Sequence, residues 1–190
     1  MITLRSKALT ASMVAVALIV TLASAPPAAA KVRQPFRTLY KSQLLVLTER
    51  NTALLVVEKD ANGGFTDRIA DCGAQAPDPV GMTVLADALR ASADAWWASA
   101  TGAAKNVKGM VSADWFTNPA DVGTVKRAAN TFVQYANRGK EALYGVASAY
   151  EAMGAGDCGT ATKVFDAALG DQGDAGDLYK TAMTTFRRVL

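Results

Sequence analysis

The sequence predicts an all-α fold: an antiparallel four-helix bundle with additional short helices, formed by a single domain over residues 31–190. Two observations support this prediction. Apolar residues recur at steps of three and four over most of the chain, which is the period of an amphipathic helix. Breaks rich in glycine and proline separate these segments, and neither a linker nor a shift in composition divides the chain.

The first 30 residues have the pattern of a secretory signal peptide. Arg5 and Lys7 precede an uncharged apolar run, and small residues at Ala28 and Ala30 suit cleavage before Lys31. A retained membrane anchor is the alternative, although the apolar run is short for a span of roughly 20 residues. We therefore expect a secreted mature chain with no membrane segment after cleavage.

The first helix is predicted over residues 35–59. Its Leu- and Val-rich end, residues 52–57, also fits a buried strand. A break follows over residues 60–79, with room for one short turn at residues 65–70, because it contains two adjacent glycines and two prolines. The stripe that predicts the helix consists of Tyr40, Leu44, Leu47 and Leu54.

The second and third helices are predicted over residues 81–107 and 119–153. Asn118 supplies a cap for the third helix, with Pro119 at its first position. Gly139 falls on the buried seam of that helix, where it would let another backbone approach closely. The seam consists of Val122, Val125, Ala129, Phe132, Ala136, Gly139, Leu143, Val146, Tyr150 and Met153.

The C-terminal part predicts a fourth helix and a short last one. Asp157 is a suitable cap for the fourth helix, on which Cys158 and Phe165 share the core side. A glycine-rich turn over residues 170–176 is expected to separate it from the last helix, which carries Leu178, Ala182, Phe186 and Val189 on one face.

Cys72 and Cys158 are the only cysteines in the chain. Disulfides persist in exported proteins, so one intramolecular bridge between these two residues is expected. Reactive or intermolecular cysteines are the alternative, and a reactive thiol needs an activating partner.

The composition argues against most catalytic chemistry. The absence of histidine removes Ser-His and Cys-His pairs, imidazole bases and the commonest transition-metal ligand. No pair of acids lies in an apolar context that would tune one of them as a general acid. Without Arg5 and Lys7, the 20 basic and 17 acidic residues leave a net charge of +1, and no basic run predicts a nucleic-acid or membrane partner. We expect a non-enzymatic protein without cofactor or metal.

Aromatic residues provide the candidates for binding. Such side chains are enriched in the hot spots of protein interfaces, and the alternative is that they fill the core. The candidates for contact with a partner protein are Trp97, Trp115 and Phe116. A second hypothesis is a carrier whose bundle encloses a small apolar or sugar-like ligand among Trp96, Phe132, Tyr150 and Phe165.

The segment 152–157, leading into 168–172, resembles the C-terminal half of the plant pectin methylesterase inhibitor and invertase inhibitor family. Residues 65–67 are similar to the hairpin that precedes the family's second cysteine, and residues 78–82 to the helix start that follows it. The family has four characteristic cysteines in two bridges. Tyr135 and Ala175 stand where the second bridge is expected.

This resemblance implies a secreted helical bundle that binds a cell-wall carbohydrate-active enzyme, either pectin methylesterase or invertase, in the apoplast. The mechanism it implies is steric, since a rigid helix face would occlude the substrate cleft of the enzyme.

Overall fold

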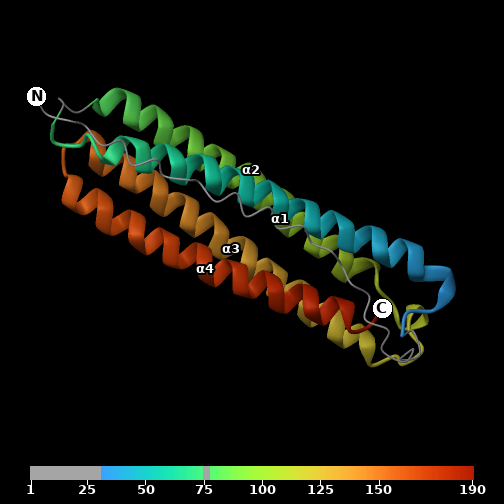
Figure 1. The fold of residues 1–190 in the computed structure, drawn as a ribbon. Coiled ribbons are helices and arrows are strands. Elements are labelled where there is room, and N and C mark those ends of the chain that lie inside the picture. Colours follow the sequence, from blue (N-terminus) through green and yellow to red (C-terminus); the bar gives the residue numbers. More distant parts are fainter. Residues whose placement is uncertain (1–30, 75–77) are drawn as a thin grey trace, which may run out of the picture.

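Four long helices lie side by side, antiparallel in succession (Figure 1). The computed structural model describes residues 31–74 and 78–190. The all-α bundle is confirmed, with long helices where a mixture of long and short ones was expected. The predicted signal peptide lies outside the described residues. The helices are α1 (Gln34–Ile69), α2 (Pro79–Met110), α3 (Asp121–Gly154) and α4 (Cys158–Arg187), and the short 3₁₀ turn η1 (Ala113–Trp115) lies between α2 and α3.

Helix α1 continues through the region where a break was predicted. Residues 60–69 are helical despite two glycines, and residues 52–57 are helical and not a strand. Packing explains the continuation: the ring of Phe65 stacks on that of Phe165 at 4.2 Å, and the Tyr150 hydroxyl donates a hydrogen bond to the Ala61 carbonyl. The hairpin implied by the family resemblance at residues 65–67 is therefore absent, because these residues lie within α1.

Helix α4 likewise continues through the predicted turn at residues 170–176. Buried Ala175 faces the core there, and the Gln172 amide pairs with that of Asn62 on α1. Tyr179 then packs against Tyr135 of α3 at a ring distance of 5.4 Å. These tertiary contacts outweigh the low helix propensity of the glycines, which costs about 1 kcal/mol for each one.

Of the caps predicted for the third and fourth helices, Asp157 is confirmed and Asn118 is not. Asp78 accepts a hydrogen bond from the amide of Gly81 at the start of α2, and Asp157 accepts one from the amide of Thr160 at the start of α4. Asn118 instead accepts from the amide of Ala120, within a turn that precedes α3.

Gly139 is close to side chains and not to a second backbone. A Cβ atom there would lie 2.9 Å from Leu54 Cδ2 and 3.1 Å from Trp96 Cη2. Gly145 allows the closer approach of two main chains, since its Cβ would lie 2.9 Å from the Cβ of Ala168 on α4. The predicted role of Gly139 is thus wrong, and Gly145, which lies outside the predicted seam, has that role instead.

Both ends of α1 are fixed to other parts of the bundle. Just beyond its C-terminus, Cys72 forms the predicted disulfide with Cys158 at the start of α4. Ahead of its N-terminus, Val32 forms an isolated antiparallel bridge with Phe116 in the connection between α2 and α3. The helix is therefore held covalently at one end and by backbone pairing at the other.

Candidate functional site

Two of the three predicted partner contacts are buried in the bundle. Trp115 is 7% exposed and Phe116 is fully covered. The Trp115 ring stacks on Phe36 at 5.1 Å, and Phe116 packs edge-on against Tyr40. The prediction that one of this pair is an exposed contact is therefore wrong, because residues near the N-terminal end of α1 cover both rings.

Trp97 is half-buried at the boundary between α2 and α3. Its indole nitrogen donates a hydrogen bond of 2.8 Å to Asn137 Oδ1. The Lys140 ammonium lies 4.8 Å from the centre of its ring and 5.1 Å from that of Tyr144. These interactions join two helices of the bundle, so the tryptophan has a structural role within the chain.

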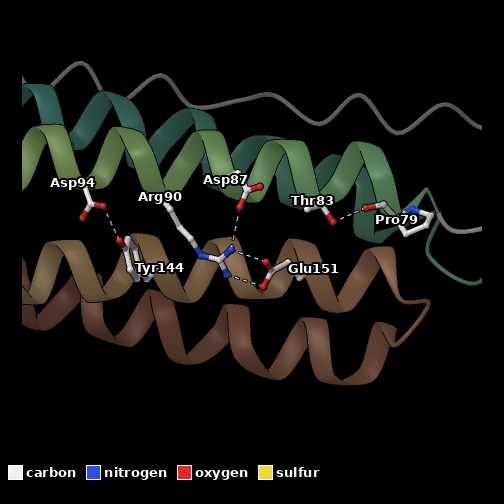
Figure 2. A network of polar contacts seen from close by, with 7 residues as sticks. All are labelled: Pro79, Thr83, Asp87, Arg90, Asp94, Tyr144 and Glu151. Atoms are coloured by element: carbon white, nitrogen blue, oxygen red, sulfur yellow. Dashed lines mark hydrogen bonds and ion pairs between the residues drawn. The ribbon is translucent and has the colours of Figure 1, made fainter.

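A row of ion pairs extends this boundary along α2 and α3 (Figure 2). Arg90 donates two hydrogen bonds to Glu151, of 2.5 and 2.6 Å, which hold the pKa of that carboxyl below its usual value. Asp94 pairs with Lys140 at 2.5 Å and accepts a hydrogen bond from Tyr144, and both contacts lower its pKa. The charged side chains at this α2–α3 boundary are therefore paired with one another.

The aromatic residues of the carrier hypothesis fall into two separate groups. Trp96 and Phe132 pack around Tyr135, at ring distances of 5.6 and 5.0 Å. Tyr150 and Phe165 instead pack around Phe65. The four rings thus belong to core packing and do not surround one common space.

Exposed apolar side chains concentrate on the first two helices. Among the described residues, eight of the nine large hydrophobic side chains that are exposed lie on α1 or α2, and α3 contributes none. Val80 and Val84 are 74% and 62% exposed, and Leu45 is 59% exposed. We name this set the α1–α2 face: Leu39, Leu45, Leu55, Val56, Val80, Val84, Leu85 and Met110.

A groove of about 350 Å³ lies between α1 and α2. Val57 and Ala61 of α1 and Leu85 and Leu89 of α2 line it, together with Tyr150 of α3. Asp60, Arg68 and Ser92 add polar groups to its lining. Since Leu85 belongs to both, the groove adjoins the α1–α2 face and gives it a recess.

Glu58 is a buried carboxyl that the sequence pattern did not single out. It is 8% exposed, and its Oε1 has no hydrogen-bond partner among the described residues. Burial raises its pKa from 4.5 to about 7. The nearby Tyr135 hydroxyl donates to Asn51, and burial, followed by the charge of Glu58, raises the pKa of Tyr135. Spacing could have revealed Glu58, because it lies four residues after Leu54 on the same buried stripe.

The described residues contain no group of three His, Cys, Asp or Glu side chains arranged to hold a metal ion. Over residues 31–74 and 78–190, none of the helices has the length and apolar character needed to cross a bilayer.

Comparisons with protein-family models, curated proteins and solved structures give no match to this chain. The functional assignment therefore depends on its own residues and their arrangement.

Proposed function

We propose that this chain is an exported, non-enzymatic protein that binds another extracellular protein through the α1–α2 face. The observation that supports the proposal is the distribution of exposed apolar side chains, eight of nine of which lie on α1 or α2 in the described part of the chain. Concentrations of exposed apolar surface on a protein are typical of interaction sites.

The surface that α3 and α4 share carries charged residues that pair with one another. Arg138 of α3 lies 3.3 Å from Asp171 and 3.7 Å from Asp174 of α4, and 3.2 Å from Glu141 on its own helix. A surface of mutually paired, exposed charges offers little desolvation free energy to a partner, whereas burial of apolar area contributes about 25 cal/mol per Å². This contrast favours α1 and α2 as the side that binds.

The architecture suits a steric inhibitor. A disulfide holds one end of α1, and ion pairs join α2 to α3. Such a bundle changes little on binding, so little free energy is lost in ordering it. The resemblance to inhibitors of pectin methylesterase and invertase supplies the class of target that we propose: a carbohydrate-active enzyme whose cleft the α1–α2 face covers.

The proposal predicts inhibition that depends on this face. We expect residues 31–190 to inhibit pectin methylesterase or invertase, and the double variant Val56→Asp/Val84→Asp to raise the inhibitory concentration at least about tenfold, since charges would be buried at the interface. Leu169→Asp is the matched control, because Leu169 is also apolar and 40% exposed but lies on α4. Its effect should stay below about twofold, as for rim positions outside a hot spot.

Circular dichroism would confirm that all three proteins are equally helical. Failure of the unaltered chain to affect either enzyme at a large molar excess would contradict the proposed target. A small molecule retained by the purified chain in native mass spectrometry would favour the carrier hypothesis instead.

A further inference from the structure

The residues that follow the predicted cleavage site are part of the folded bundle. Val32 is 1% exposed and belongs to the hydrophobic core. The amide of Arg33 donates to the carbonyl of Trp115 and the amide of Thr117 donates to that of Lys31, each at 2.8 Å. Arg33 also donates through Nε to the carbonyl of Phe116. A cut before Lys31 would therefore leave a chain whose first three residues are already held in place.

Asp121, the first residue of α3, is a carboxylate that lacks a full set of partners at this same place. It is 6% exposed, and its Oδ2 is buried without a hydrogen-bond partner among the described residues. Its Oδ1 lies 3.9 Å from Lys31 Nζ, beyond hydrogen-bond distance. Tyr40 does not donate a hydrogen bond to Asp121, since its hydroxyl donates to the Phe186 carbonyl. A buried carboxylate oxygen is costly unless it is paired with a donor or a cation.

We propose that Asp121 is the internal receptor for the α-ammonium group that Lys31 acquires when the chain is cut between Ala30 and Lys31. This rests on the proposed export and on cleavage by a signal peptidase. Hydrolysis of that peptide bond consumes one water and leaves a carboxylate on Ala30 and an ammonium on Lys31. In the uncut chain the same nitrogen is a neutral amide with one hydrogen. After cleavage it carries a positive charge and three donors, which suit the unpartnered oxygen of Asp121.

Lys31 already lies close to Asp121, so only a small movement of the N-terminus is needed to form this ion pair. The carbonyl of Lys31 accepts a hydrogen bond from the Thr117 amide, four residues before Asp121, and its side-chain ammonium lies 3.9 Å from Asp121 Oδ1. The α-ammonium group would donate a hydrogen bond to Oδ2 of Asp121. Processing would thereby lock the N-terminal segment over Trp115 and Phe116, so that the mature form is more stable than the precursor.

Two chains that differ only at their first residues test this. One begins at Lys31 and the other at Ala28, both released from cleavable fusions that leave no extra residues. We expect the Lys31 chain to melt about 3–6 °C higher, which corresponds to a partly buried charge pair in a domain of this size. Asp121→Asn should remove the difference between the two chains, and acetylation of the Lys31 α-amino group should remove it without any substitution.

A second readout separates pairing from a general effect of chain length. The α-amino group of a free peptide titrates near pH 8, and in the Lys31 chain its midpoint, followed by NMR with labelled lysine, should lie at least about one pH unit higher. Equal melting temperatures together with an ordinary titration would overturn the proposal. Since neither readout involves a partner protein, such a failure would leave the α1–α2 face untested and intact as a binding surface.

Discussion

Removing the disulfide between Cys72 and Cys158 is expected to lower the free energy of unfolding by about 4–5 kcal/mol, because the bridge restricts an unfolded chain over a sequence separation of 86 residues. For a domain of this size that corresponds to a drop in Tm of roughly 10–20 °C. The measurement is thermal unfolding of the double variant Cys72→Ser/Cys158→Ser, followed by circular dichroism.

Reduction of the unaltered protein is the matched control, since it opens the same link without substituting a residue. Both samples should melt at the same lowered temperature. A difference of less than about 2 °C between the oxidised and reduced forms would show that the bridge contributes little, in conflict with the chain-entropy account.

The second large effect is expected at Glu58. Its pKa is about 7 in the folded protein, above the ordinary value of 4.5, because the carboxyl is buried. The folded state therefore keeps the proton more readily than the unfolded state, and stability falls as the pH rises from about 4.5 to 7. The loss should reach about 3 kcal/mol above neutral pH, because a tenfold difference in proton affinity between the two states corresponds to about 1.4 kcal/mol.

Glu58→Gln should remove this decline and make the protein more stable than the unaltered chain at pH 8, where the variant carries no buried charge. Tyr135 on α3, whose pKa is raised by burial and then by the charge of Glu58, is uncharged at that pH. Glu49→Gln, at an exposed position of the same helix, is the control and should leave the pH profile unchanged. Parallel urea-unfolding profiles for all three proteins between pH 5 and 8 would contradict the buried-charge account.

The amphipathic pattern and the caps predicted the helices, but not where two of them end. Gly63-Gly64 in α1 and the three glycines over residues 170–176 in α4 are breaking signals in the local sequence. Each segment remains helical because of contacts with residues far away in the sequence, such as Phe65 with Phe165 and Asn62 with Gln172. Such pairings follow from the three-dimensional arrangement, which a single sequence does not reveal.

The sequence predicted apolar side chains as the candidate contacts, but it pointed to the wrong residues. Aromatic residues were the expected anchors, yet Trp115 and Phe116 are covered by the start of α1. Trp97 of α2 is hydrogen-bonded to Asn137 of α3. Exposed aliphatic residues such as Val80 and Val84 gave no signal, since an apolar residue in a helix is ordinarily assigned to the core. Only the packed bundle shows which apolar side chains remain uncovered.

Hydrogen–deuterium exchange tests the proposed binding face most directly. The chain would be measured alone and with pectin methylesterase or invertase in excess. The account predicts slower exchange in peptides that cover residues 45–57 of α1 and 80–92 of α2, with α4 unchanged. No protection with either enzyme, or protection confined to α3 and α4, would contradict the claim that α1 and α2 form the binding surface.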